Sequence, residues 1–345
     1  EEVARIYGFE SIPDVPPMAR AKMFSHPEVR RGAHALRRLA AAQDYQEVVN
    51  YSFVEADWER DYAGNDTPVK LVNPIASHLS VMRSSLIASL VANIRHNANR
   101  KQTRVRLFEL GRVFTRDDSA QDGPLAVAGV RQPLKLAGAA WGPAVGEQWG
   151  VPARHVDFYD VKMDVEALFG ARGSRLRFEA AAYPALHPGR SARIELDGKQ
   201  VGWIGELHPR LAQQADLAHA PVVFEVDVAA LSEGELPQVR ELSRQPVVVR
   251  DLALWVDAPV TAQSMLDIVA AAVKADPQLS VVRDARVFDL WRDKAQGDQP
   301  VSEKSLAFRF WLQDTQVTLD EARVATCLAS IKEALVAAHG ARQRA

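Results

Sequence analysis

At 345 residues the chain is too long for one ordinary hydrophobic core, so its length predicts about two or three domains. Its composition, 47% apolar and 25% charged, is average for globular proteins, and a net charge of -2 argues against nucleic-acid binding through bulk charge. No apolar run reaches the ~20 residues needed to span a bilayer, and no signal peptide is recognisable at the start. The single Cys327 excludes an internal disulfide framework and a cysteine metal cluster, which favours a reducing cytoplasm.

The first residues show a short helical pattern. Val3, Ile6 and Tyr7 fall on one side, and Gly8 is predicted to end the helix. The chain begins with Glu-Glu rather than Met, already inside this pattern, which indicates a piece of a longer protein. The proline-rich residues 9–23 then predict an extended linker.

A helix and a strand are predicted within residues 73–114, after a helix at 27–43, a strand at 47–54 and a short helix with a loop at 57–68. The apolar stripe of the main helix consists of Ile87, Leu90, Val91 and Ile94, extended by Met82 and Leu86, with Ser85, Ser89, Asn93 and His96 off it. Polar residues 97–101 end the helix.

The strand that follows carries charged residues between its apolar ones. Arg104, Arg106 and Glu109 alternate with Val105, Leu107 and Leu110, which predicts that one face of the strand is polar or lines a cleft. Some nucleotide-binding sheets are built from a helix that leads into such a strand.

The middle of the chain continues with further predicted elements. They are an exposed loop at 116–124, a buried strand at 134–141, a helix at 161–169 with Val161, Val165, Leu168 and Phe169 inward, a hairpin at 191–207, a strand at 222–228 and a domain boundary at 234–244. The hairpin prediction is specific, because Asp197-Gly198 supplies the positive φ angles of a tight turn.

The last hundred residues predict a β-α-β-β-α unit, which is the ferredoxin-like pattern. The elements are strands at 247–256, 281–291 and 305–313, helices at 262–273 and 319–338, and a weak last strand at 340–344. Thr318 and Glu321 have the spacing of a capping box for the second helix, and its apolar stripe makes Cys327 a core residue.

Alternation divides the side chains of this small sheet between two faces. The inward set is Leu252, Leu254, Val256, Phe288, Leu290, Leu306, Phe308, Phe310 and Leu312, and the outward set is Ala253, Trp255, Val287, Asp289, Trp291, Ser305, Ala307, Arg309 and Trp311. Three tryptophans with polar neighbours are typical of a platform on which RNA bases stack, although packing under a neighbouring domain explains them equally well. Residues 240–345 hold 14 Lys and Arg against 14 Asp and Glu, so this unit would read a few bases rather than grip a backbone.

Several stretches carry a resemblance to a known family. They are EEVARIYGFESIP at the start, NPIASHLSVMRSSLIASLVANIRHNANR with RLFELGRVF, HPGRSARIELDGKQVGWIGELHP, and SRQPVVVRDLALWV, RVFDLWRD and TQVTLDEA near the end. In this order they resemble the C-terminal half of bacterial phenylalanyl-tRNA synthetase β subunits, over essentially the whole chain.

The resemblance implies an α+β architecture. Residues 1–20 would be the end of a small upstream domain plus a linker, 21–235 a non-catalytic class II aminoacyl-tRNA synthetase-like antiparallel-sheet module, and 243–344 a ferredoxin-like anticodon-binding domain. The family charges tRNA(Phe) with phenylalanine in the cytoplasm, using ATP, as a tetramer of two α and two β subunits. The active site belongs to the α subunit, and editing belongs to β domains outside this chain.

The residues themselves agree that this module is not an active class II site. Such a site needs arginines from two motifs to hold the ATP phosphates. Here Phe108 runs directly into Glu109 without the Arg of a Phe-Arg-x-Glu arrangement, and Arg190 leads into a predicted strand rather than a helix. No phosphate-cradling Gly loop is recognisable. We therefore interpret the module as a scaffold for the α subunit.

Two groups of site residues follow from the resemblance. In the family, two glutamates like Glu1 and Glu2, with upstream aspartates, surround a Mg²⁺ ion shared with the α subunit, although the residues alone favour a solvated helix turn. Asp289, Trp291 and Ser305, with Ala253, correspond to contacts of the first anticodon base, and the Asp289 carboxylate suits the donors of a guanine edge. The histidines, among them His187 and His208, lack metal-ligand spacing.

Two other functions compete with this interpretation. One is an active class II enzyme or metabolic relative that binds an amino acid in the central module, which the missing arginines oppose. The other is a free-standing RNA-binding protein, which the neutral charge of the last unit opposes.

Overall fold

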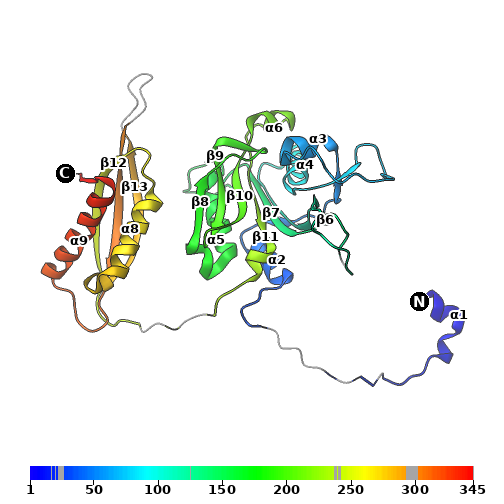
Figure 1. Ribbon diagram of the computed structural model, residues 1–345, viewed down its shortest axis with the longest axis horizontal. Helices are drawn as coiled ribbons and strands as arrows, with labels where there is room; N and C mark the ends of the chain where they lie inside the picture. Colours follow the sequence, from blue (N-terminus) through cyan, green and yellow to red (C-terminus); the bar gives the residue numbers. More distant parts are fainter. Residues whose placement is uncertain are drawn as a thin grey trace. The chain divides into compact units, whose positions relative to one another are not determined.

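A computed structural model describes residues 1–16, 18–19, 21, 27–124, 126–236, 239, 242–292 and 302–344. The chain divides into two compact units, Glu1–Pro237 and Gln238–Ala345 (Figure 1). Over the described residues, no helix is long and apolar enough to cross a membrane.

The first unit is organised around one large mixed sheet. Its helices are α1 (Glu2–Tyr7), α2 (Ala33–Ala42), α3 (Ala56–Trp58), α4 (Ile87–Ala98), α5 (Phe158–Phe169), α6 (Pro209–Gln214) and α7 (Val228–Ser232), with single turns at Phe9–Ser11, Glu59–Ala63 and Gly170–Arg175. Its strands are β1 (Gln46–Glu47), β2 (Phe53–Val54), β3 (Val81–Met82), β4 (Val105–Arg112), β5 (Thr115–Arg116), β6 (Val130–Arg131), β7 (Leu134–Trp141), β8 (Leu176–Ala180), β9 (Leu186–Leu196), β10 (Lys199–Leu207) and β11 (Val222–Asp227).

The main sheet has the order β1-β4-β7-β11-β10-β9-β8, and helices cover both of its faces. Only the β1–β4 pairing is parallel among these strands as described. Helices α2, α5 and α7 pack through one apolar cluster that contains Phe108 and Leu136. Helices α4 and α6 pack through a second cluster, on the face of Leu107 and Ala139. Apolar side chains therefore join α4 to β4 and β7.

Several elements of this unit confirm the sequence-based predictions. The strand at 134–141, the helix with Val161 and Val165 inward, and the strand from Val222 are all present. The hairpin of β9 and β10 turns at Asp197 and Gly198, whose φ angles are 52° and 76°. At the start, α1 ends at Gly8, where φ is 93°.

Other predictions of local structure were wrong where tertiary hydrogen bonds replace a regular element. Helix α2 begins at Ala33 rather than near residue 27, because the backbone of Arg31 donates to the Ser232 carbonyl at 2.8 Å. The strand predicted at 47–54 splits into β1 and β2, because Asn50 and Tyr51 bond to side chains of Glu109 and Arg83 instead of to a strand.

The predicted helix within 73–114 is also shorter at its start. Met82 belongs to β3, and Leu86 is the residue that caps α4. Ser85 and Ser89, predicted off the apolar stripe, are 3% and 5% exposed. Ser85 is buried because its hydroxyl donates to the buried carboxylate of Glu225 at 3.0 Å.

The charged residues of β4 do not share a face, contrary to the sequence-based prediction. Arg106 and Glu109 are three positions apart, and side chains alternate along a strand, so the two point to opposite faces. Arg106 is paired with the buried carboxylate of Asp164 at 2.8 Å, and Tyr45 donates to the same oxygen at 2.9 Å. On the other face, Glu109 is paired with Arg83 at 2.8 Å. Both charges serve internal ion pairs rather than a cleft.

The second unit is a sheet with two helices on one face. Its elements are β12 (Val248–Asp257), α8 (Ala262–Ala275), a 3₁₀ turn at Pro277–Val281, β13 (Val282–Arg292), β14 (Glu303–Leu312), α9 (Glu321–His339) and β15 (Arg342–Gln343). The strand order is β13-β14-β12-β15, and every pairing among these described strands is antiparallel. The core joins Met265 and Ile331 of the helices to Phe308 and Phe310 of β14.

Two details of this unit differ from the prediction. The cap of α9 is Asp320, whose carboxylate accepts from the Arg323 backbone at 2.7 Å, and not Thr318 with Glu321. Cys327 is in the core as predicted, 3% exposed.

A β-bulge between Val287 and Asp289 shifts the register of β13, so Val287 packs inward and Phe288 is 50% exposed.

We predict that Gly138→Ala strongly destabilises the first unit. A Cβ at this position would lie 2.3 Å from the ring of Phe224, which is 1% exposed and cannot move without disturbing the core. Urea unfolding, followed by hydrogen exchange of β7 and β11, should show a loss of about 1–3 kcal/mol. Gly146→Ala is the control, because an added Cβ there meets nothing within 4 Å. Equal stability of the two variants would contradict this packing.

A second prediction concerns Glu225, whose carboxylate accepts from the Leu86 backbone at 2.7 Å at the start of α4. Burial raises the pKa of Glu225 in the folded protein above its value in the unfolded chain. The folded protein therefore keeps the Glu225 proton to higher pH than the unfolded chain does. This difference adds to the free energy of unfolding at pH values below the unfolded pKa, and the addition is lost as the pH rises through the folded pKa.

Glu225→Gln keeps an acceptor for Leu86 and removes this titration. The stability of the variant relative to the parent should therefore increase between about pH 4.5 and pH 7.5. Hydrogen exchange of the α4 amides measures this difference in stability at each pH. Glu147→Gln, at an exposed position, is the control. A difference that stays constant with pH would contradict the raised pKa.

Candidate functional site

The face of the second sheet opposite α8 and α9 gathers aromatic and charged side chains. We call it the tryptophan face, after Trp255, Trp291 and Trp311. Trp255 on β12 and Trp291 on β13 both pair with Ser305 of the central strand β14. Their rings meet edge to face, with centroids 5.1 Å apart and an angle of 89°. The two indoles therefore come together across β14.

Ser305 lies beneath this pair and is covered. It is 2% exposed, and its hydroxyl oxygen has no hydrogen-bond partner among the described residues. A buried hydroxyl without a partner costs about 1–3 kcal/mol. A hydrogen-bonding group that entered between the rings would relieve that cost.

Asp289 and Ala253 lie in the next row across the same face. Asp289 pairs with Ala307 of β14, which pairs with Ala253 of β12. The small side chains of these two alanines leave space beside the indoles. The Asp289 carboxylate is exposed, and no residue that the structure describes donates to it or forms an ion pair with it. Its acceptor oxygens are therefore available to a ligand.

The row beyond is closed by an ion pair. Arg309 and Asp251 make two bonds of 2.8 and 2.7 Å, and this guanidinium lowers the pKa of Asp251. The Arg309 guanidinium also lies 4.6 Å from the centroid of the Phe288 ring, which the bulge has turned outward. This edge of the tryptophan face is rigid and already neutralised.

The structure thus brings together all four residues that the sequence predicted for the second unit: Asp289, Trp291, Ser305 and Ala253. Sequence reasoning missed Arg344, whose guanidinium lies 5.9 Å from the Trp255 ring centroid and 5.2 Å from that of Trp291. The signal was present in the weak last strand, because alternation puts Arg344 on the same side as Arg342, which pairs with Trp255.

The other predicted pair, Glu1 and Glu2, lies at the exposed start of α1. Glu2 is bound to Arg5 of the same helix at 2.5 Å, and its side chain is 78% exposed. Among the described residues, no group of three or more His, Cys, Asp or Glu side chains could hold a metal ion. Mg²⁺ prefers six oxygen ligands, so these two carboxylates would need further ligands from elsewhere.

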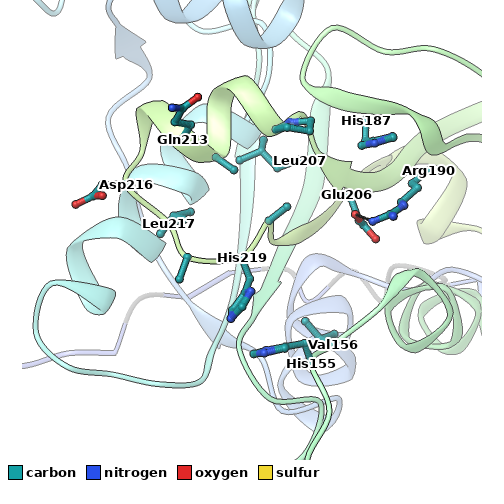
Figure 2. A pocket seen from close by; sticks show the side chains of 14 residues that line it. His155, Val156, His187, Arg190, Glu206, Leu207, Gln213, Asp216, Leu217 and His219 are labelled. Carbon is teal, nitrogen blue, oxygen red and sulfur yellow. Dashed lines mark hydrogen bonds and ion pairs between the residues drawn. The ribbon is translucent and has the colours of Figure 1, made fainter.

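A shallow depression of about 620 Å³ lies in the first unit beside α6 (Figure 2). Its charged lining residues are Arg190, Glu206 and Asp216, whose charges sum to -1, and Arg190 is bound to Glu206 at 2.7 Å. Arg190 lies in β9, as predicted, and does not head a helix. A lining with a net negative charge does not favour the binding of nucleotide phosphates.

The histidines near this depression serve the fold. The His155 and His219 ring centroids are 3.8 Å apart (Figure 2). The Nδ1 atoms of His187 and His208 accept from the backbone of Gly189 and Arg210, at 3.0 and 3.2 Å. These bonds hold local turns, in the second case the start of α6.

Comparisons with known proteins agree with the resemblance in the sequence. Residues 12–228 match the family model of the phenylalanyl tRNA synthetase beta chain CLM domain, and residues 243–344 match the ferredoxin-fold anticodon binding domain. The chain is 78% identical over 345 residues to the phenylalanine–tRNA ligase beta subunit of Bordetella bronchiseptica, covering 100% of this chain and 43% of that protein.

More distant relatives give the same result. The phenylalanine–tRNA ligase beta subunit of Burkholderia pseudomallei is 51% identical over 346 residues, covering 100% of this chain and 42% of that protein. A solved pyrrolysyl tRNA synthetase of Desulfitobacterium hafniense aligns with a TM-score of 0.42 and 12% identity over 59% of this chain and 66% of its own, which is too low to support an assignment. The chain spans less than half the length of the curated relatives it matches. From the two family models, it belongs to the phenylalanyl-tRNA synthetase beta chain family.

Proposed function

We propose that this chain is the C-terminal part of the β subunit of a cytoplasmic phenylalanine–tRNA ligase. In this function it supports the catalytic α subunit and binds the anticodon of tRNA(Phe) on the tryptophan face. The observation that carries the proposal is the exposed Asp289 beside Trp291, to which no described residue is bonded, within the part of the chain that matches an anticodon-binding family.

The chemistry of the tryptophan face suits one splayed-out base. An indole offers a stacking surface worth about 1–3 kcal/mol per base. The free oxygens of Asp289 can accept from the N1–H and N2–H₂ groups of guanine, and an unpaired carboxylate repels the acceptor edges of other bases. Ala253 and Ala307 leave room for the base beside the rings.

We propose that the first unit is a class II synthetase-like module that no longer catalyses. Its candidate charges are used internally: Arg83 with Glu109, and Arg106 with Asp164, are all below 10% in side-chain exposure. Removing one partner of such a buried pair costs about 3–5 kcal/mol, because the other charge is left buried and unpaired, so these charges are not available to ATP. Helix α4 packs on the sheet through apolar side chains.

The complete enzyme, in this proposal, is a tetramer of two α and two β subunits that uses ATP and Mg²⁺. The contribution of this chain to that metal site would be small: Glu1 and Glu2 would supply two carboxylate ligands to a Mg²⁺ ion shared with the α subunit, completed by residues outside this chain. Hard oxygen ligands of this kind suit that ion.

We predict that Asp289→Ala with Trp291→Ala, in the full-length subunit assembled with its α partner, raises KM for tRNA(Phe) at least about tenfold. One lost stacking interaction already accounts for this factor. ATP–pyrophosphate exchange with phenylalanine should stay unchanged, because it needs no tRNA. Aminoacylation kinetics with a tRNA(Phe) transcript measure both quantities.

The matched control for this double variant is Asp118→Ala with Trp149→Ala, which removes the same groups from exposed positions of the first unit. Its effect on KM should be clearly smaller. Unchanged tRNA kinetics in the first variant, or an equal loss in both, would contradict the assignment of the anticodon site to Asp289 and Trp291.

Support of the α subunit is tested by co-expression. The full-length β subunit should co-purify with α and charge tRNA(Phe), whereas α alone should not. Failure to form a complex would overturn the proposed function. Binding of unrelated single-stranded RNA as tightly as tRNA(Phe) would favour a free-standing RNA-binding protein instead.

A further inference from the structure

The Arg344 side chain reaches across the tryptophan face. Its backbone N–H donates to the Ala253 carbonyl at 2.9 Å, which ties the end of the chain to β12. From there the guanidinium extends over Trp255 and Trp291, 5.9 and 5.2 Å from the two ring centroids. Because these rings belong to strands on either side of β14, the charge is held above the central strand, beside the row of Asp289.

The charge of Arg344 has no carboxylate partner within ion-pair distance in the part of the chain that the structure describes. Three other arginines of this sheet differ in this respect. Arg309 is bound to Asp251, Arg286 to Asp284, and Arg342 to Glu303. The unit is neutral in sum, and the exposed Asp289 carboxylate lies on the same face, so the positive potential of the unpaired guanidinium is local to Arg344.

The hydrogen-bond donors of Arg344 are also free. A guanidinium has five N–H donors at its edges, and contact with an aromatic face does not use them. None of the described residues accepts from this side chain. The two rings fix its position, which reduces the entropy lost when it binds a ligand. A fixed fork of free donors is the arrangement that binds phosphate oxygens in pairs.

We propose that Arg344 binds a backbone phosphate of the RNA whose base is read by Asp289 and stacks on Trp291. This inference rests on the proposed function and adds a residue to it. Recognition is then divided: Asp289 reads the base edge, whereas Arg344 contributes affinity that does not depend on the base. The contact neutralises one phosphate, although the unit has no net positive charge.

The test uses the full-length β subunit assembled with α, and a tRNA(Phe) transcript. Dissociation constants are measured between about 50 and 300 mM KCl for the parent, Arg344→Gln and Arg344→Lys. Arg344→Gln should bind about three- to tenfold more weakly at the lower salt, and the slope of log K against log salt should be shallower by about 0.7, the value for one single-strand phosphate. Arg344→Lys keeps the charge, so it should keep the slope.

Lys274→Gln is the matched control, because it removes one exposed positive charge from α8, on the helical side of the sheet. It should leave affinity and slope nearly unchanged. A second transcript with the first anticodon base replaced separates phosphate from base contacts. Arg344→Gln should weaken binding of both transcripts by the same factor, whereas Asp289→Ala should weaken the unmodified transcript more.

The outcomes distinguish this inference from the proposed function. If the parent complex does not bind tRNA(Phe), the proposed function fails. If the parent binds and Arg344→Gln matches it in affinity and slope, Arg344 does not contact the RNA. A loss confined to one transcript, or a loss without a change of slope, would overturn the assignment to a phosphate. Circular dichroism melting of each variant checks that the fold is retained.

Discussion

The register of β14 with its two neighbours is the constraint on which the tryptophan face depends. Ser305 pairs with Trp255 on one side and with Trp291 on the other, and this shared partner brings the two indoles together. Because side chains alternate between faces, a slip of one residue in either pairing would turn one indole into the core. The apolar cluster of Phe308, Phe310 and their helix partners prevents such a slip, since it would bury polar side chains.

The charged side chains of the two units differ in burial and in ion pairing. In the first unit, Arg83, Arg106 and Glu109 are buried and paired, with bonds of 2.8 Å. Paired charges of this kind hold loops and strands in one arrangement, and their exposure is too low for a solvent-borne ligand. On the tryptophan face, Asp289 and Arg344 are exposed and unpaired among the described residues. This contrast supports a division into a scaffold and a recognition surface, in agreement with the two family models.

The structure also shows what the charged side chains of the central strand contact. Periodicity predicts a helix and a strand within residues 73–114, and both elements are present as α4 and β4. The prediction that this strand lines a cleft depended on Arg106 and Glu109 pointing to the same face. Three residues along a strand reverse the side-chain direction, so these charges meet different partners, Asp164 and Arg83. Those partners come from distant segments that no local pattern identifies.

The sequence by itself determined the order of elements in the second unit, the core position of Cys327 and the residues Asp289, Trp291, Ser305 and Ala253 as one candidate group. Period-2 alternation and the Asp197-Gly198 turn are local properties, so they can be read without a structure. Only the tertiary structure decided that Phe288 is outward, that Ser305 is covered and that Arg344 lies over both indoles. A bulge, the meeting of two rings across a strand and the docking of β15 depend on pairing between distant segments, which local periodicity does not contain.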